Sequence, residues 1–390
     1  MRRFPRTRIA VAAVFFLKGQ IRYDQVAAFA QCNAHRDAMT GRSPTPLHVN
    51  YSTATAESVG EFLATRYALP GPIECSLLRR GFNDSFEVLD ANGQRYVLRL
   101  SCRRTRGEAD VASETEFLTY LDSVGVPVAV PVPAQDGALF SCGLLPEGQR
   151  PVVLFRHIGG RSPRPGAAAD AAAQGITLAR IHRAAENYAG GKVAHYRLDL
   201  DHLLHRQLAV VMGIKPLATK TREYLSELAS RLSASVAAAG HLSWTLCHGD
   251  CHGGNARIAD DGPRAGQAVF FDFDDGGPGY LAYDLAVYLW GNVFLPRERV
   301  AMWHAFIDGY RSIRPISATD FDALHLFVPI RHIWLMGEYA GRIAEWGSEA
   351  VPVEWLAKQA ELLQAWEDEK LSPRLLWINL SGARRAGYWC

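Results

Sequence analysis

Acidic and amide side chains gather in one stretch of the chain, between Trp244 and Trp290, at spacings that suit chemistry on a phosphate group. Asp250 and Asn255 stand five positions apart, and Asp272 follows a segment with the pattern of a short β-hairpin. Such a hairpin would return Asp272 to the side of Asp250 and Asn255. Phosphoryl transfer needs a carboxylate that accepts the proton of the attacking hydroxyl, and oxygen ligands for Mg²⁺. The spacing therefore predicts Asp250 as catalytic base and Asn255 and Asp272 as metal ligands.

The same stretch resembles a known family signature. His248-Gly249-Asp250, Asn255, Asp272 and Asp284-Leu285-Ala286 are similar to the signature of the aminoglycoside phosphotransferase and choline kinase-like superfamily, which includes type II homoserine kinases, methylthioribose kinases and stress response kinases. The resemblance implies an α+β, two-lobe protein-kinase-like fold, with a small antiparallel-sheet N-lobe and a larger, mainly helical C-lobe. It further implies that His248 and Asp284 support the catalytic loop, and that ATP and Mg²⁺ are required.

Other interpretations of this stretch remain open. Cys247, His248, Cys251 and His252 could bind zinc, although structural zinc sites normally draw their ligand pairs from two separate segments. The spacing Cys-x-x-x-Cys-His is one residue too long for haem attachment. The acids could also be solvated loop residues, or belong to a relative that binds nucleotide without turning it over.

Composition limits the class of protein. The chain has 390 residues, of which 48% are hydrophobic, so it can bury a large core and form two lobes. Its apolar runs are too short for a membrane span. The net charge is +2, but residues 1–50 hold eight Lys or Arg and two Asp, so the remainder is slightly acidic. We therefore expect neither a nucleic acid nor a membrane as partner.

The first residues fit the rest of the chain poorly. Four arginines precede an apolar run from Ile9 to Leu17, and Ala28-Phe29-Ala30 resembles a signal-peptide cleavage site. An enzyme that uses ATP is expected in the cytoplasm, and seven cysteines with no Cys-x-x-Cys suit free thiols in a reducing compartment. We therefore expect residues 1–54 to form a basic extension and linker, in a cytoplasmic protein.

Residues 55–155 are predicted to form the N-lobe. The pattern indicates helices over 55–67 and 108–124, and strands over 73–78, 85–89, 96–100, 138–142 and 151–155. The turn from Arg80 to Ser85, which contains Asn83, occupies the place of a nucleotide-covering loop. Arg99 stands where kinases place a phosphate-binding lysine, and Arg at this position is familiar among choline kinase-like proteins. Glu114 is predicted to orient Arg99, with Glu116 as competitor.

Residues 156–390 are predicted to form the C-lobe. A hinge over Phe155 to Ile158 would bind the adenine, and helices are expected over 167–185, 198–211, 219–238, 297–311, 320–346 and 353–370. His182 is expected to be a core residue. Arg331, Trp334, Glu338 and Arg342 share one helical face. Trp334 and Glu338, together with Asp275, could bind an amino group of the acceptor, although a solvated stripe with Trp334 in the core is equally compatible.

These features predict a kinase that moves the γ-phosphate of ATP to a hydroxyl of a small molecule, either an amino alcohol or an aminoglycoside-like compound. A protein Ser/Thr kinase of the stress-response type is the alternative. A regulatory protein that binds nucleotide without catalysis is a third possibility.

Overall fold

The computed structural model describes residues 47–102, 106–190, 196–293 and 300–367. The predicted basic extension lies almost wholly outside these residues, as do the first residues of the helix expected at 297 and the last of the one expected to reach 370. The described residues from Val49 onward belong to one compact unit. Within it, N-lobe denotes the elements from α2 to β5 and C-lobe those from α4 to α11.

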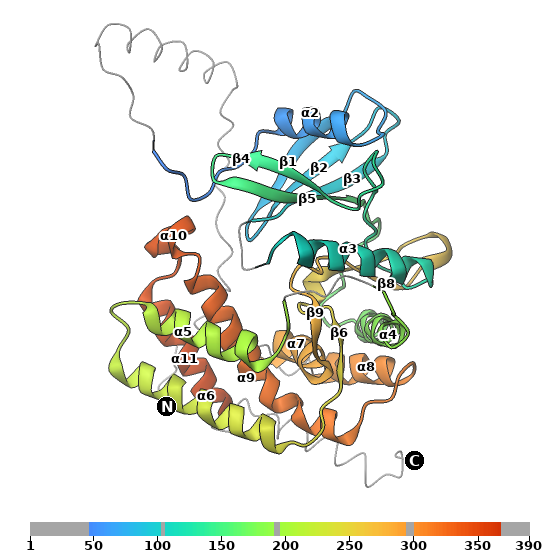
Figure 1. The fold of residues 1–390 in the computed structure, drawn as a ribbon. Coiled ribbons are helices and arrows are strands. Elements are labelled where there is room, and N and C mark those ends of the chain that lie inside the picture. Colours follow the sequence, from blue (N-terminus) through green and yellow to red (C-terminus); the bar gives the residue numbers. More distant parts are fainter. Residues whose placement is uncertain (1–46, 103–105, 191–195, 294–299, 368–390) are drawn as a thin grey trace, which may run out of the picture. The chain divides into compact units, whose positions relative to one another are not determined.

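The N-lobe is a five-stranded antiparallel sheet with one helix on each side (Figure 1). Its strands stand in the order β1-β2-β3-β5-β4, and β2 pairs with β3 in one continuous antiparallel register. The strands are β1 (Glu74–Arg80), β2 (Asp84–Leu89), β3 (Arg95–Leu100), β4 (Ser141–Leu145) and β5 (Gly148–Arg156). The helices are α2 (Ala56–Arg66) and α3 (Glu108–Ser123).

Alternating side chains on the strands explain how α2 is held on the sheet. Phe86 and Val88 on β2 are buried while Ser85, Glu87 and Leu89 are only partly buried, which is the period of a strand with one covered face. These side chains form one core with Leu63 and Tyr67 from α2 and its C-cap. Thr55 caps the start of α2, because its hydroxyl accepts a hydrogen bond from the Ser58 N–H.

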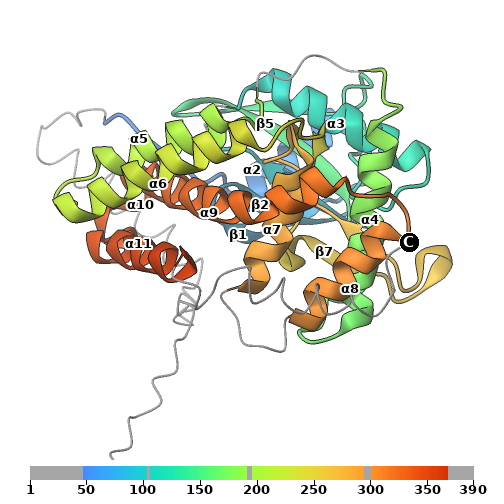
Figure 2. The ribbon, with the colours of Figure 1, turned by 90° about the horizontal axis from the view of Figure 1, so that it is seen from below.

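The C-lobe is mainly helical and surrounds two short antiparallel strand pairs. Seen from below, α5, α6, α9 and α11 run side by side, while α4 pairs with α8 on the other flank (Figure 2). The helices are α4 (Ala168–Ala185), α5 (Arg206–Gly213), α6 (Thr219–Ala238), α7 (Leu281–Val293), α8 (Val300–Arg311), α9 (Ala318–Ala340), α10 (Ile343–Trp346) and α11 (Val353–Glu367). The strand pairs are β6 (Trp244–Cys247) with β9 (Gly277–Tyr280), and β7 (Ala256–Ile258) with β8 (Ala268–Phe270).

Several predicted elements differ from those observed. The helix expected over 320–346 is two helices, because the chain leaves α9 at Gly341, a residue with low helix propensity. The helix expected over 198–211 starts later, with a π-helical turn at Asp201–His205. The strand expected over 138–142 is shifted to Ser141–Leu145, since residues up to Gly137, which has φ of 84°, form a turn.

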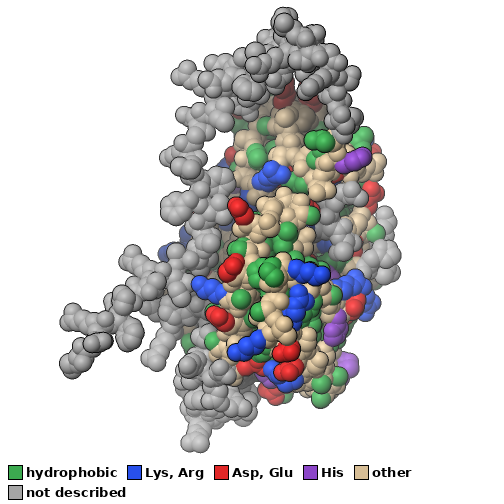
Figure 3. All heavy atoms as spheres, turned by 90° about the vertical axis from the view of Figure 1, so that its left-hand side faces the viewer, with side chains coloured by type: hydrophobic (Ala, Val, Ile, Leu, Met, Phe, Trp, Pro, Cys, Tyr) green, Lys and Arg blue, Asp and Glu red, His purple; other side chains and the backbone are tan. Residues whose placement is uncertain are grey.

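On the face drawn in Figure 3, the described residues form no continuous patch of Lys and Arg side chains. Lys and Arg side chains are interspersed there with Asp and Glu. No helix within the described ranges combines the length and hydropathy that crossing a membrane requires.

Candidate active site

The loop after β6 is anchored by the buried carboxylate of Asp284 on α7. Its two oxygens accept hydrogen bonds from the backbone N–H groups of His248, at 2.7 Å, and Gly249, at 2.8 Å. The same carboxylate lies 3.0 Å from the Nε2 atom of His182, whose other ring nitrogen lies 2.8 Å from the Tyr310 hydroxyl. Burial acts to raise the pKa of Asp284, yet His182 and the loop N–H groups keep that pKa below its ordinary value. Asp284 therefore holds the loop, and His182 lies in the core as expected.

The backbone conformation and surroundings of residue 249 leave room only for glycine. Its φ is +81°, and a Cβ at this position would lie 2.0 Å from the carbonyl oxygen of Asp275. Next to it, His248 is buried, and its Nδ1 accepts the Asp250 N–H at 3.2 Å while its Nε2 lies 3.1 Å from the Phe271 carbonyl oxygen. Burial lowers the pKa of His248, so the ring is neutral and donates from Nε2. His248 thereby ties the loop to the segment after β8 that contains Asp272.

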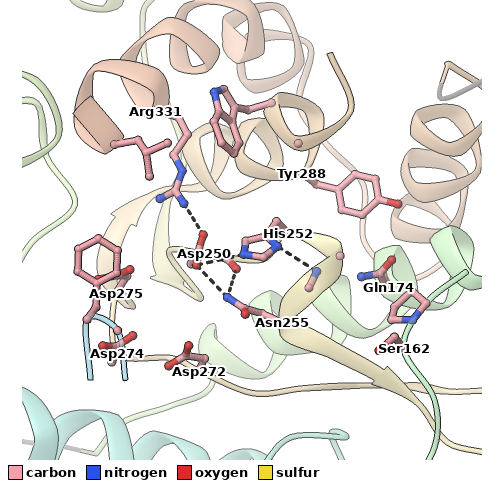
Figure 4. A pocket seen from close by; sticks show the side chains of 18 of the residues that line it. Ser162, Gln174, Asp250, His252, Asn255, Asp272, Asp274, Asp275, Tyr288 and Arg331 are labelled. Atoms are coloured by element: carbon pink, nitrogen blue, oxygen red, sulfur yellow. Dashed lines mark hydrogen bonds and ion pairs between the residues drawn. The ribbon is translucent and has the colours of Figure 1, made fainter. Parts of the chain in front are cut away.

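Asp250 projects from this loop into a cavity (Figure 4). One of its carboxylate oxygens is paired with the Arg331 guanidinium. The other accepts a hydrogen bond of 2.8 Å from the Asn255 amide and lies 3.5 Å from the His252 Nε2. Burial would raise the pKa of Asp250, but Arg331 and His252 hold it below its ordinary value. The carboxylate is thus ionised and held from three sides.

Arg331, which holds Asp250, was not predicted as a site residue. It is 2% exposed and also donates to the Tyr283 hydroxyl at 3.2 Å, while its guanidinium lies 4.3 Å from the centre of the Trp334 ring. The helical pattern placed Arg331 on one face with Trp334. Nothing local in the sequence connects residue 331 to Asp250, because the contact spans 81 positions.

Asp272 follows β8 and shares the cavity with Asp274 and Asp275. Its φ of 66° is unusual for a non-glycine residue and turns the chain so that its carboxylate faces the cavity. Although Asp272 retains exposed surface, the surrounding protein together with Asp274, Asp275 and Asp250 raises the pKa of its carboxyl well above the ordinary value. Crowded carboxylates of this kind fit a bound cation.

The donor set near Asp272 fits a hard divalent cation such as Mg²⁺. Asn255 uses its amide N–H group on Asp250, so its carbonyl oxygen is available as a ligand. Mg²⁺ typically takes one or two protein carboxylates and completes its shell with phosphate oxygens and water. Across the described ranges, no group of three or more His, Cys, Asp or Glu is arranged to hold a metal by itself. Asn255 and Asp272 are therefore suited to a metal that arrives with phosphate.

Zinc binding by the cysteines finds no support in the geometry. Cys251 donates to the Asp284 carbonyl oxygen at 2.9 Å and Cys247 to the Tyr280 carbonyl oxygen at 3.5 Å. Both thiols are buried, and burial raises their pKa values well above the ordinary range, whereas metal binding needs thiolates.

Arg99 on β3 forms a two-pronged ion pair with Glu114 on α3. The two nitrogen–oxygen distances are 2.8 and 2.7 Å, and both side chains are buried. The geometry thus selects Glu114 over Glu116 as the partner. Asn83, in the turn before β2, reaches across to the C-lobe and donates to an Asp274 oxygen at 2.6 Å. Arg99 and Asn83 both line the cavity that contains Asp250.

The structure separates the predicted acceptor residues. Asp275 is buried and lines the cavity. Trp334 is 3% exposed and donates from its indole N–H to His202 at 3.2 Å, while Glu338 accepts a hydrogen bond of 2.9 Å from Gln207. Trp334 and Glu338 are therefore engaged within the C-lobe rather than at the cavity, which α9 lines through Arg331, Leu335 and Tyr339.

The predicted hinge residues Phe155 and Ile158 are not among the residues that line the main cavity. Phe155 is half-buried, and its ring centre lies 5.4 Å from the Arg99 guanidinium carbon. Ile158 lines a separate cavity of about 360 Å³ together with Val128 and Val269.

The main cavity, of about 720 Å³, lies between the lobes. Its volume falls in the range typical of ligand sites. The N-lobe wall of the cavity is formed by the turn at Gly81–Asn83 and by Arg99. The C-lobe wall includes residues from the loop after β6, from the segment after β8 and from helices α7 and α9. Its charged lining combines four aspartates with four arginines, so carboxylates that suit a cation and guanidinium groups that suit phosphate line the same cavity: Asp250, Asp272, Asp274, Asp275, Arg79, Arg99, Arg164 and Arg331.

Comparisons with known proteins agree with this geometry. The chain is 38% identical to an uncharacterized protein of Deinococcus radiodurans over 340 residues, which is 85% of this chain and 94% of that protein. It is 27% identical over 310 residues to a homoserine kinase of Caulobacter vibrioides, covering 76% of this chain and 90% of that one.

Two solved structures share the fold. A microcompartment-associated aminopropanol kinase superposes with a TM-score of 0.67 at 21% identity, covering 81% of this chain and all of that one. The amicoumacin kinase hAmiN, solved with AMP-PNP and Ca²⁺, also gives 0.67 at 19% identity, covering 81% of this chain and 95% of that one. The predicted kinase-like α+β fold is therefore confirmed.

A family model described as "Phosphotransferase enzyme family" matches residues 74–316. This range contains Arg99, Glu114 and the whole segment from His248 to Asp284. The prediction of a phosphotransferase is thereby confirmed, and the chain belongs to the phosphotransferase enzyme family.

Proposed function

We propose that the protein transfers the γ-phosphate of ATP to a hydroxyl group of a small amino alcohol. The observation that carries this proposal is the convergence of Asp250, Asn255 and Asp272 on one cavity that also contains Arg99. Family membership supplies the reaction class, and the geometry supplies a role for each residue.

Asp250 acts as the base. Its carboxylate is fixed by Arg331 and Asn255, so an acceptor hydroxyl bonded to it would be held in one orientation. The hydroxyl oxygen attacks the γ-phosphorus, the bond to the ADP oxygen breaks, and the hydroxyl proton passes to Asp250. Because the pKa of Asp250 lies below its ordinary value, it contributes mainly by positioning and by accepting the proton late.

Arg99 and Asn83 would hold the nucleotide. The Glu114 carboxylate fixes the plane of the Arg99 guanidinium, which presents its charge to phosphate oxygens. Asn255 and Asp272 would bind Mg²⁺, which when bound neutralises charge on the phosphates.

An amino alcohol is the acceptor that the cavity lining favours. Asp274 and Asp275 are acidic, and Tyr339 and Trp290 supply aromatic surface nearby. A cationic amino group is attracted both by carboxylates and by aromatic faces. The names of the homoserine kinase relative and of the aminopropanol kinase neighbour are in keeping with this class.

A panel assay tests the proposal. The full-length protein is incubated with Mg·ATP and, separately, homoserine, 1-amino-2-propanol, ethanolamine, choline or an aminoglycoside, and ADP and phosphorylated products are measured by mass spectrometry. We expect one of these compounds to be phosphorylated, and ADP to be released only when that compound is present. Phosphate found on protein side chains instead would favour the protein kinase alternative, and tight ATP binding without any product would favour the non-catalytic one.

A further inference from the structure

The turn between β1 and β2 contacts the C-lobe through an aromatic side chain. The Phe82 ring centre lies 5.5 Å from that of Tyr339, at the end of α9, and 5.2 Å from that of Trp346 in α10. The Arg342 guanidinium carbon, from the segment between these helices, lies 5.4 Å from the same ring centre. Phe82 therefore packs within a cluster formed by the C-terminal end of α9 and by α10.

Polar contacts secure the same turn. The Asn83 amide donates to Asp274 at 2.6 Å, and its carbonyl oxygen accepts the Cys102 N–H at 3.1 Å. Arg342 is buried and donates across the lobes to the Cys102 thiol at 3.2 Å. The turn is thus joined to the C-lobe by both ring packing and hydrogen bonds.

Phe82 is not needed to build the N-lobe. The core on which α2 packs is made by Phe86, Val88 and their neighbours on the sheet, and it does not include Phe82. Tyr339 and Trp346, whose rings contact that of Phe82, both belong to the C-lobe. Phe82 therefore contributes to the contact between the lobes rather than to the core of the N-lobe.

Phe82 also lines the main cavity, together with Tyr339, Leu335 and Asp275. Leu335 and Tyr339 follow Arg331 on the same helix at spacings of four, so this wall stands next to the group that holds Asp250. The face of an aromatic ring next to a carboxylate is a chemical setting that favours a cationic group.

We infer that Phe82 is a specificity-determining residue for the acceptor. The turn that covers the nucleotide also completes the wall of the acceptor end of the cavity, and the ammonium group of the acceptor lies against the Phe82 ring. This inference rests on the proposed transfer to an amino alcohol. It adds that acceptor recognition is shared between the lobes and is complete only when the turn is seated on α9 and α10.

Substitutions at residue 82 test the inference with the full-length enzyme. Phe82→Ala is expected to raise the KM for whichever panel amino alcohol is phosphorylated by about tenfold, a loss of one cation–π and packing contact. The Kd for Mg·AMP-PNP should stay within about twofold, since Asn83 and Arg99 remain. Phe82→Tyr should restore the acceptor KM. Leu78→Ala, at an exposed position on β1, is the matched control and should change neither value.

Phe82→Leu separates the chemistry of the ring from its bulk. If an ammonium group lies on the ring, Leu should raise the acceptor KM nearly as much as Ala. Full recovery with Leu would overturn the cationic part of the inference. A tenfold weaker Kd for Mg·AMP-PNP with an unchanged acceptor KM would overturn the inference as a whole, because Phe82 would then serve only the nucleotide.

A readout without any acceptor keeps this test separate from the proposed function. With Mg·ATP alone, Phe82→Ala should release phosphate to water several-fold faster than the wild type, because the opened wall admits water. If no panel compound is phosphorylated, the proposed function fails while this rate still reports on Phe82. An unchanged rate of ATP hydrolysis in the Ala variant would contradict the inference.

Discussion

Asp250 shows how one residue is prepared by distant parts of the chain. Asn255 lies five positions away and its contact with Asp250 is local, whereas Arg331 comes from a helix 81 positions later. The first contact could be predicted from spacing. The second could not, because it depends on the packing of α9 against α7. Helix packing also explains why Trp334, a candidate for binding the acceptor, is buried and donates its indole N–H to His202 instead.

Replacing Arg331 tests its role in holding the base. Arg331→Met should lower kcat by roughly ten- to a hundredfold, because Asp250 loses the group that fixes one carboxylate oxygen. The Kd for Mg·AMP-PNP should change little. Added guanidinium chloride at millimolar concentration should partly restore kcat, measured by ADP release. No loss of kcat in the Met variant would remove Arg331 from the account.

Asp272 is predicted to set the metal requirement. Asp272→Asn should lower kcat by roughly a hundredfold or more and raise the Mg²⁺ concentration needed for half-maximal rate, because a carboxylate ligand is replaced by a neutral amide. EDTA should abolish the activity of the wild type, and excess Mg²⁺ should restore it. An Asn variant with the wild-type Mg²⁺ dependence would show that Asp272 does not bind the metal.

At the level of elements, the close crossing of α4 and α8 depends on two glycines. A Cβ on Gly175 would lie 1.9 Å from the Phe306 carbonyl oxygen, and one on Gly309 would lie 2.3 Å from that of Ala172. The helices can therefore approach backbone to backbone, which places His182 of α4 beside Tyr310 of α8. This crossing supports Asp284, and through it the loop that carries Asp250.

A pair of glycine substitutions measures that crossing. Gly175→Ala should lower the free energy of unfolding by about 1 to 3 kcal/mol, because the helices must separate. Gly60→Ala, in α2, is the control: its Cβ would meet the Ile73 carbonyl oxygen at 3.4 Å, an ordinary contact. That variant should be neutral or gain about 0.5 kcal/mol from helix propensity. Urea unfolding measures both, and equal effects in the two variants would contradict the packing argument.

Sequence patterns located most elements but not all of their limits. The hairpin of β7 and β8 and the helix α3 lie close to where periodicity placed them, because local alternation and helical spacing determine them. Strand β9 could not be predicted, since Gly277, Pro278 and Gly279 are typical of turns and pair with β6 only through the tertiary fold.

Across the whole molecule, two buried histidines link helices through tryptophan side chains. The Trp334 indole donates to His202 at 3.2 Å, and the Trp290 indole donates to His332 at 3.1 Å. Each accepting nitrogen must be unprotonated. Burial lowers the pKa of both histidines from 6.5 to about 4. These contacts join α7, α9 and the turn before α5 in the neutral state.

These histidines predict how stability depends on pH. A histidine whose pKa is lower in the folded state binds its proton more readily when unfolded, so stability is fully present above pH 6.5 and falls as pH drops toward 4. Each could contribute a loss of the order of 3 kcal/mol at most. Urea unfolding followed by tryptophan fluorescence between pH 7 and 4 measures the slope. His202→Gln should reduce it, and a flat profile in the wild type would contradict the prediction.

The fold class could be predicted from the sequence because the loop from His248 to Asp284 carries a specific signature, and the structural neighbours confirm it. The acceptor side could not be predicted to the same depth. In the account proposed above it is formed by Phe82 in the N-lobe and Tyr339 in the C-lobe, two residues far apart in the sequence whose rings meet only when the lobes pack.

The central claim is that Asp250 directs the γ-phosphate of ATP to a small-molecule hydroxyl. The most direct measurement follows γ-labelled ATP with the active panel compound in the wild type, in Asp250→Asn and in Asp261→Asn, an exposed acid in the β7–β8 turn. We predict that label reaches the compound in the wild type and in Asp261→Asn, and that Asp250→Asn transfers it about 10²- to 10⁴-fold more slowly. Transfer at the wild-type rate in Asp250→Asn would contradict the account.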